Sequence, residues 1–407
     1  MATGQESQST SPLVYPFELI LELTPNLADF SGLTILNFPQ IKWESDINSF
    51  FAYSVLNLND PVGMILDELL FIEGLIFRIK FGKRDYGFFD HKYTWSENQM
   101  LDARPGKHIS GINKLILISA EYLKDLPVSK AWRGQTISAI AQSIATNVFG
   151  IPIAKQHITT TMGTPDVPQM NEKSSSYLKR LARIACGSSN NKSPFYTFIN
   201  DQGEFYFMNL DELIRQDSVF DYEFNLNLTM STEVRYVKGY TFLQGGLPVN
   251  YDNYKNKVYV IDNQGNYVSQ EPTLANFFVK KTNNEKILIR RSNVSSVTNV
   301  HNFGIEETTA DQYVTKGKIA SLYRTSAISY RMQIISQFNP KVYTGKCINV
   351  SVDSVMQQKR IAAQYCGKWL IIADELVSSN TGQPWQLLTL AKSAMPISSN
   401  HRITDFL

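Results

Sequence analysis

The residues that most often carry catalysis are present in this chain but do not fall into catalytic spacings. The five histidines are His91, His108, His157, His301 and His401, and none of them forms an HxH or HExxH pattern. Zinc ligation from one helix needs two histidines on the same face, which the HExxH spacing supplies. Isolated histidines are more often packed in a core or partly exposed. We therefore expect neither a metal site nor a catalytic histidine.

Three acidic pairs could supply the carboxylates of a glycoside hydrolase: Asp211–Glu212, Glu306–Glu307 and Asp374–Glu375. Such an enzyme needs two carboxyl groups about 5 to 9.5 Å apart across a cleft. Sequence alone does not show that arrangement, and charged side chains are mostly exposed. Solvated positions are the favoured interpretation. A β-rich hydrolase acting on a glycan and a trimeric sugar-binding module remain as alternative hypotheses.

Phosphate-binding patterns are absent from the sequence. Every Gly-Lys pair is followed by a residue other than Ser or Thr, so no GxxxxGK[ST] loop exists, and GxGxxG and GxSxG are missing as well. Glu285 lies between the basic pairs Lys280–Lys281 and Arg290–Arg291, which favours a solvated hairpin over a phosphate site. We expect no catalytic, cofactor-binding or metal-binding residue in this chain.

Composition indicates a globular protein without a dominant charge. The chain has 407 residues, of which 43% are hydrophobic, so two to four units with real cores are expected. Its 39 basic and 37 acidic residues nearly balance, which argues against a dedicated nucleic-acid binder. The three cysteines, Cys186, Cys347 and Cys366, form no CxxC pair and predict free thiols in a reducing compartment.

The start of the chain and its most apolar window predict a soluble protein made in the cytosol. Residues 1–12 are polar and lack the basic start and apolar run of a signal peptide, so we expect a flexible arm. The apolar window 64–77 is interrupted by Asp67, Glu68 and Glu73. It falls short of the roughly 18 unbroken apolar residues that a membrane helix needs.

The first part of the chain predicts antiparallel β structure. Strands are expected at 17–23, 35–38, 75–81 and 114–120, and aromatic residues recur at Trp43, Phe50, Phe51 and Tyr53. Turn signals separate the strands at 82–87 and 103–107. These elements favour a first β-barrel domain over 13–125.

The next part predicts two helices and a hairpin. Ile137, Ile140, Ala141, Ile144, Ala145 and Val148 share one helical face, and Gly150 supplies a stop. A second helix is expected to begin at 174–176, with its N-cap there, and to end before Gly187. The aromatic runs 195–199 and 204–208 flank a polar turn and predict a hairpin. A middle domain over 126–230 follows.

The last part predicts a β elaboration over 231–310 and a closing domain over 311–407. Strands are expected at 222–228, 233–240, 257–261 and 286–290. Three- and four-residue steps through Ala320, Tyr323, Ala327, Tyr330 and Ile334 predict a long helix, with both tyrosines favoured as core. Further strands are expected at 347–353, 368–375 and 385–390, with a turn at 378–382.

The order of elements in 311–394 resembles the closing part of the central hub proteins of contractile phage tails. It is also similar to the amino-terminal region of type VI secretion spike proteins. The run Tyr177-Leu178-Lys179-Arg180-Leu181-Ala182 resembles the Tyr-Leu-x-x-Leu-Ala segment of that family, although Gly187 lies one residue later. The segments 111–121 and 367–375 also share an order of Gly, Lys, apolar run and acid.

The resemblance implies a fold and a set of partners. The fold would be α+β and β-rich, with two tube-like antiparallel β-barrel domains and a helix-containing middle domain. The protein would be the structural, non-enzymatic hub of a virion tail baseplate, assembled in the host cytoplasm. It would be a homotrimer whose pseudo-sixfold ring adapts a hexameric tail tube to a trimeric central spike. Other partners would be tube-initiator proteins, baseplate wedge proteins, and the tape-measure protein and DNA that pass through the lumen.

Overall fold

The computed structural model describes most of the chain. The described residues are 18–24, 40–60, 75–83, 87–100, 111–224, 234–243, 254–262, 264–270, 285–287, 297–324, 326–328, 330–352, 366–379, 384–392 and 396–398. The expected arm 1–12, the strand 35–38, the loop 103–107, His108, His401 and both basic pairs lie outside these residues.

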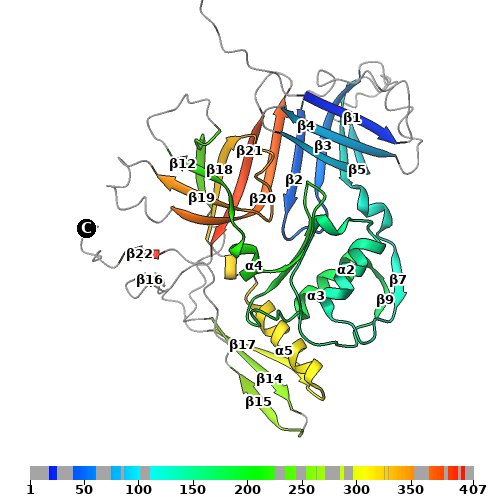
Figure 1. Ribbon diagram of the computed structural model, residues 1–407, viewed down its shortest axis with the longest axis vertical. Helices are drawn as coiled ribbons and strands as arrows, with labels where there is room; N and C mark the ends of the chain where they lie inside the picture. Colours follow the sequence, from blue (N-terminus) through cyan, green and yellow to red (C-terminus); the bar gives the residue numbers. More distant parts are fainter. Residues whose placement is uncertain are drawn as a thin grey trace, which may run out of the picture.

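One sheet of 12 strands organises the molecule (Figure 1). Its strands come from residues 18–119 and from residues 218–392. The path through the sheet is β1-β4-β5-β6-β3-β2-β20-β21-β18-β13, and β19 pairs with both β20 and β12. The first half consists of β1 (Glu18–Thr24), β2 (Gln40–Asp46), β3 (Tyr53–Asp60), β4 (Ile76–Lys83), β5 (Gly87–Met100) and β6 (Gly111–Ser119). The second half consists of β12 (Ser218–Phe224), β13 (Gly239–Leu243), β18 (Tyr330–Gln337), β19 (Cys347–Val352), β20 (Gly367–Ser379) and β21 (Trp385–Lys392).

The halves join where β2 pairs antiparallel with β20, from Gln40↔Ser379 to Asp46↔Ala373. The same edge of β20 pairs with β19 nearer its start, from Val350↔Gly367 to Cys347↔Leu370. On the opposite edge, the register with β21 shifts between Ile371 and Ala373. A bulge of this kind bends and twists a strand. The bend therefore lies where β20 changes partners between the two halves.

Aromatic and aliphatic side chains pack across this junction. Trp43 of β2 is fully buried, and its ring centroid lies 5.2 Å from those of both Phe81 and Phe89. Phe81 in turn lies 5.4 Å from Phe338, which follows β18 in the second half. Buried aromatic rings contribute both apolar area and favourable edge contacts. The two halves therefore share a core.

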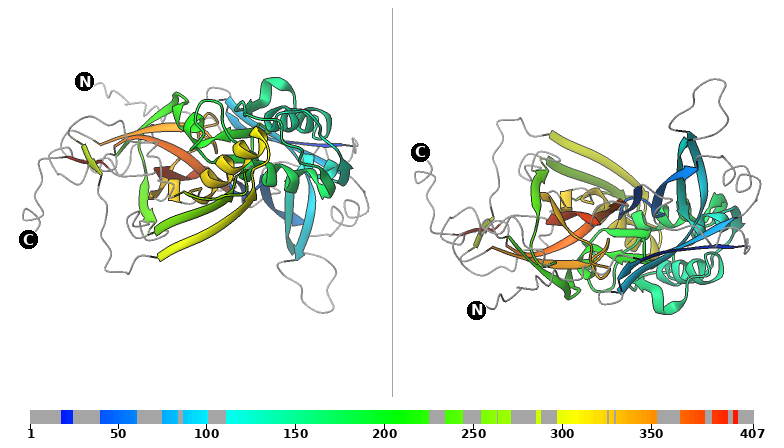
Figure 2. Two further views of the ribbon diagram at one scale, coloured as in Figure 1. Left: turned by 90° about the horizontal axis from the view of Figure 1, so that it is seen from below. Right: turned by 90° about the horizontal axis from the view of Figure 1, so that it is seen from above.

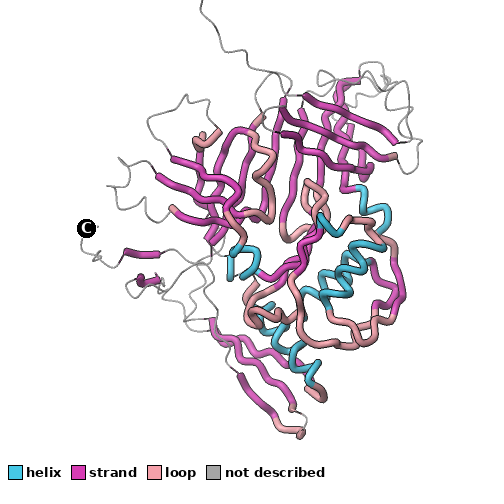
Figure 3. Tube along the Cα trace, in the orientation of Figure 1, coloured by secondary structure: helices cyan, strands magenta, loops and turns pink. Residues whose placement is uncertain are grey.

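The middle region packs its helices below the sheet (Figure 3). Its elements are η3 (Ala120–Lys124), β7 (Pro127–Lys130), α2 (Ile137–Asn147), η4 (Ile153–Lys155), β8 (Gln156–Ile158), β9 (Gln169–Lys173), α3 (Ser174–Ile184), β10 (Phe195–Ile199), β11 (Phe205–Asn209) and α4 (Leu210–Arg215). The apolar faces of α2 and α3 bury against Phe195, Phe205 and Phe207 of the β10–β11 hairpin. The other face of the hairpin packs on Leu370 and Ile372 of β20. The hairpin thus joins the helices to the sheet.

Of the remaining elements, α5 and the strands β14, β15 and β17 lie at the bottom of Figure 1, and β16 and β22 lie at its left; Figure 2 shows the molecule from below and from above. They are β14 (Tyr254–Ile261), β15 (Tyr267–Gln270), β16 (Glu285–Ile287), β17 (Val297–Ile305), α5 (Thr309–Leu322), η5 (Ser326–Ile328) and β22 (Pro396–Ser398). β14, β15 and β17 form a three-stranded sheet, and β16 pairs with β22. α5 begins with a capping box between Thr308 and Asp311 and packs on α3.

Most expected elements are confirmed, including both middle helices, the aromatic hairpin and the three closing strands. β20 runs on to Ser379, into the expected turn. The expected N-cap at 174–176 is wrong, because Lys173 precedes the helix, and Ser175 donates from its backbone N–H to Asp125 Oδ1 over 2.9 Å. β5, with 14 residues, and β17 were not expected from the sequence.

The expected long helix through Ile334 is wrong. α5 ends at Leu322, and residues 330–337 form strand β18 instead. Met332, Ile334 and Ser336 are buried while Ile335 is exposed, which is the alternation of a half-buried strand. β18 pairs with β21 along its whole length. Tyr330 therefore lies on a strand, and Tyr323 ends the helix as a buried C-cap.

The fold is β-rich α+β, as expected at the level of class. Among the described residues, no sheet closes into a barrel. In the same part of the chain, no helix is both long and apolar enough to cross a bilayer.

Gly317 of α5 is expected to be required for the contact with α3. A Cβ placed there would collide with the backbone of Ile184 and Ala185. Helix propensity alone favours Gly317→Ala by up to about 1 kcal/mol. The collision should reverse that sign, and we expect a net loss of about 1–3 kcal/mol in the free energy of unfolding, measured by urea titration.

Gly239→Ala is the matched control, because its Cβ would lie at an ordinary 3.5 Å from Ile335. We expect its free energy of unfolding to change by no more than about 0.5 kcal/mol. A Gly317→Ala protein as stable as the wild type would contradict the close packing of α5 on α3.

Candidate functional site

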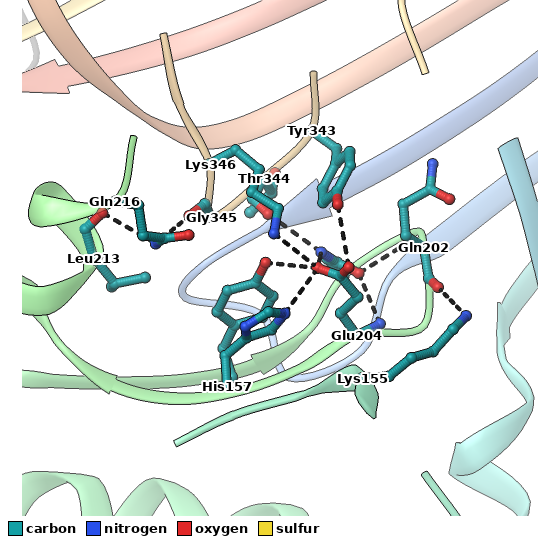
Figure 4. A network of polar contacts seen from close by, with 12 residues as sticks. Lys155, His157, Gln202, Glu204, Leu213, Gln216, Tyr343, Thr344, Gly345 and Lys346 are labelled. Atoms are coloured by element: carbon teal, nitrogen blue, oxygen red, sulfur yellow. Dashed lines mark hydrogen bonds and ion pairs between the residues drawn. The ribbon is translucent and has the colours of Figure 1, made fainter. Parts of the chain in front are cut away.

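A network of polar side chains gathers around Glu204 where the middle region meets the second half of the sheet (Figure 4). Its Oε2 accepts from Tyr206 Oη over 2.7 Å and lies 3.3 Å from Lys346 Nζ and 3.2 Å from His157 Nε2. Its Oε1 accepts from Tyr343 Oη over 3.1 Å. Both carboxylate oxygens of Glu204 are therefore engaged by donors from three separate segments.

The surroundings of Glu204 hold it in the charged form. Burial opposes ionisation, but the His157 imidazole, the Tyr206 hydroxyl and the Lys346 ammonium outweigh it and lower the pKa of Glu204 to about 2. Burial and the Glu204 carboxylate raise the pKa of Tyr206 and of Tyr343. Both phenols therefore remain hydrogen-bond donors at neutral pH.

A tight turn brings Lys346 to Glu204. Gly345 has a φ of +93°, in the left-handed region that favours glycine, and a Cβ there would lie 3.0 Å from Phe198 and 3.1 Å from Tyr206. The Gly345 N–H donates to the Ile371 carbonyl over 3.0 Å. The Gln216 side chain donates to the Gly345 carbonyl over 3.0 Å. The turn is thus fixed to β20 on one side and to the residue after α4 on the other.

A second set of polar groups is buried beside this network. Asp201, in the turn between β10 and β11, is 3% exposed, and Asp374 of β20 is 2% exposed. Burial and the nearby charge of Asp374 raise the pKa of Asp201 well above its usual value, so Asp201 keeps a proton and shares it with Asp374. Thr344 donates to Asp374 Oδ1 from its hydroxyl over 2.5 Å and from its backbone over 3.2 Å. The pair fastens the hairpin turn to the sheet.

An open cavity of about 530 Å³ adjoins Glu204. It is lined by Lys155, Gln202, Glu204, Val219, Pro340, Lys341, Tyr343 and Lys346. The lining comes from η4, the hairpin turn, β12 and the loop between β18 and β19. The cavity therefore forms only when these distant segments pack together.

The histidines have separate surroundings. His157 belongs to the Glu204 network. His91 is buried, lies 2.9 Å from Ser119 Oγ and 3.7 Å from Glu121, and burial lowers its pKa. His301 of β17 lies 3.2 Å from Asn256 Oδ1. In the described part of the chain, no three His, Cys, Asp or Glu residues are placed to hold a metal ion.

The acidic pairs do not face each other across a cleft. Asp211 pairs with Arg215 over 2.9 Å, and Glu212 accepts from Thr159 over 2.6 Å. Glu375 pairs with Lys42 over 3.2 Å on the side of β20 opposite to buried Asp374. The Asp201–Asp374 pair is too buried to meet a glycan. Glu306 and Glu307 follow β17.

The three cysteines, all among the described residues, form no disulfide; Cys186 and Cys347 are buried and Cys366 is partly buried. Apart from His157, which the sequence marks only as an isolated histidine, the sequence predicts none of the residues of the Glu204 network or of the cavity as functional. Gly345–Lys346 is one of the Gly-Lys pairs that lack the Ser or Thr of a phosphate loop, and no pattern in the sequence marks Tyr343 or Lys341. The one available signal was the run of polar residues in the turn 200–204.

Replacing the Glu204 carboxylate should make the free energy of unfolding depend less on pH in the acidic range. A depressed folded pKa contributes stability that is present above the unfolded pKa of about 4.5 and is lost as pH falls towards about 2. We expect Glu204→Gln to cost about 2 kcal/mol in the free energy of unfolding at pH 6 and much less at pH 3. Urea titrations at both pH values measure this, and an equal cost at both would contradict the ionised state of Glu204.

Replacing Asp201 should have the opposite pH dependence. A raised folded pKa contributes stability that is fully present below the unfolded carboxyl pKa and is lost as pH rises through the folded pKa. Asp201→Asn keeps a donor for Asp374 and cannot ionise. We expect its free energy of unfolding, relative to wild type, to increase between pH 4.5 and pH 8.5 in urea titrations. A difference that is constant or decreases with pH would refute proton sharing.

Comparison with known proteins shows a shared fold. No family model and no curated protein matches the sequence. The tail protein from Neisseria meningitidis MC58 superposes with a TM-score of 0.52 at 10% identity, over 93% of this chain and 97% of its own. The 43 kDa tail protein of prophage MuSo2 from Shewanella oneidensis superposes with a TM-score of 0.53 at 13% identity, over 92% and 98%. The expected resemblance is confirmed at the level of the fold: this chain has the fold of these two tail proteins.

Proposed function

We propose that this protein is the structural hub of a phage-type tail baseplate. It would form a homotrimer in which each chain contributes two similar β units to a pseudo-sixfold ring. Such a ring adapts a hexameric tail tube on one side to a trimeric central spike on the other. Duplicating a unit within one chain resolves the change from sixfold to threefold symmetry.

The pairing of β2 with β20 is the observation that carries this proposal. Six strands from the start of the chain and six from its later part lie edge to edge in one sheet. The matching segments 111–121 and 367–375 correspond to β6 and β20, and both strands have neighbours on either edge. Two related units within one chain would be expected to pair in this way if they took the places of two adjacent subunits in a ring.

The fold likeness to two tail proteins supports the same reading over nearly the full chain. Shape and buried contact would then do the work, and we propose no catalytic role. No observation favours the glycan alternatives: Asp211 and Glu375 pair with Arg215 and Lys42. Asp374 is buried, and neither Glu306 nor Glu307 lines the described cavity.

We further propose the division of the chain that the sequence indicated. Two tube-type β-barrel units would occupy 13–125 and 311–407, with the barrels closing only in the assembled ring. The helix-containing region 126–230 and the elaboration 231–310 would lie outside the ring and frame the spike, except for strands β12 and β13, which complete the second half of the sheet. Tube-initiator proteins, wedge proteins, and the tape-measure protein and DNA in the lumen complete the partners, in a virion baseplate assembled in the host cytoplasm.

Native mass spectrometry and negative-stain imaging of the purified protein test the proposal. We expect a species of three times the chain mass of 46.2 kDa and particles with threefold symmetry around an open centre. A stable monomer at micromolar concentration, or particles with twofold symmetry, would overturn it.

A further inference from the structure

We propose that the cavity beside Glu204 is a docking site for an acidic segment of a protein partner, whose carboxylates enter between Lys155, Lys341 and Lys346. The identity of the partner, a neighbouring protein of the tail, rests on the proposed function. The chemistry of the cavity stands on its own geometry.

Charge in the cavity is unbalanced. Its lining holds three lysines and one carboxylate, Glu204. Tyr206, Tyr343, His157 and Lys346 already engage both oxygens of that carboxylate. Within the described part of the chain, the Lys341 ammonium has no bonding partner, and the Lys155 ammonium donates only to the Gln202 carbonyl, over 2.9 Å. Neither ammonium group forms an ion pair with a carboxylate of the described residues. The Asp90 carboxylate is near enough to feel the charge of Lys155, but it is already bonded to Arg78.

The excess of positive charge is local. The whole chain carries a net charge of only +2, so the cavity does not share a generally basic surface. Low-dielectric walls around a cavity strengthen the field of such charges and attract an oppositely charged ligand. An anionic ligand is thus the class that the cavity favours.

Size and lining favour an acidic peptide over a nucleic acid. At about 530 Å³ the cavity lies within the range of about 300–1,000 Å³ that suits a few side chains, and it is too small for a duplex. Val219, Pro340 and the ring of Tyr343 supply apolar walls for the methylene groups of glutamate. Flexible lysines act as point charges that accept carboxylates in many orientations.

Fluorescence polarisation with the full-length protein tests the site. The probe is a fluorescein-labelled, C-terminally amidated hexapeptide of alternating glutamate and aspartate, and an Asn/Gln hexapeptide is the uncharged reference. We expect saturable binding of the acidic probe that weakens as salt rises, because salt screens exposed charges. Binding of the uncharged peptide with equal affinity, or no acidic-peptide binding at low salt, would overturn the proposal.

The double variant Lys155→Gln/Lys341→Gln should weaken binding at least tenfold. The matched control, Lys192→Gln/Lys316→Gln, removes the same charge at two exposed lysines outside the cavity lining and should bind within about twofold of wild type. An equal loss in both variants would overturn the site. Urea titration of each variant confirms that folding is retained, since both substituted cavity lysines are exposed.

Competition separates the possible sources of negative charge. Inorganic phosphate that displaces the probe at the same concentration as an unlabelled acidic peptide would identify a small-anion site and overturn the peptide assignment. A trimer that binds no acidic peptide would overturn only this inference. A monomer that binds it through Lys155 and Lys341 would overturn only the proposed hub.

Discussion

The backbone pairing of β2 with β20 is the constraint on which the rest of this structure depends. It joins segments from opposite ends of the chain, so its formation carries a large cost in loop-closure entropy. Burial of Trp43, Phe81 and Phe338 against one another offsets that cost. Once the pairing exists, the aromatic hairpin has a surface to pack on, and the turn at Gly345 has a strand to bond. The Glu204 network is therefore a consequence of the sheet.

Burial acts on the carboxyl groups of this region in two opposite ways. Glu204 remains ionised because lysine, imidazole and phenol groups surround it. Asp201 is buried beside Asp374 and retains a proton that it shares with that residue. The difference follows from which partners the neighbouring segments supply, since both side chains belong to the same hairpin turn region. Each solution avoids an unpaired buried charge, which is among the most costly features a fold can contain.

Local patterns in the sequence predicted the elements that local forces decide. The helix 137–147 and the hairpin 195–209 follow from apolar spacing and turn residues that tertiary contacts do not override. The strand 330–337 was missed because Tyr330 and Ile334 fit both a helical and an alternating period, and the pairing with β21 decides between them. β5 was missed because its buried positions include the polar residues His91 and Thr94, which break the alternation of apolar and polar residues. No sequence pattern links Lys155, Glu204 and Lys346, because they lie far apart in the sequence and only folding brings them together. The fold class could thus be predicted from the sequence, and the site could not.

The divided edge of β20 has a mechanical consequence. One continuous strand is bonded to β19 of its own half near its start and to β2 of the opposite half further along. Rigid-body rotation between units needs a loop or an element end that absorbs changes in backbone angles. No such hinge separates the halves at this strand. Force applied to one half is therefore transmitted to the other as shear across a ladder of hydrogen bonds rather than through a hinge.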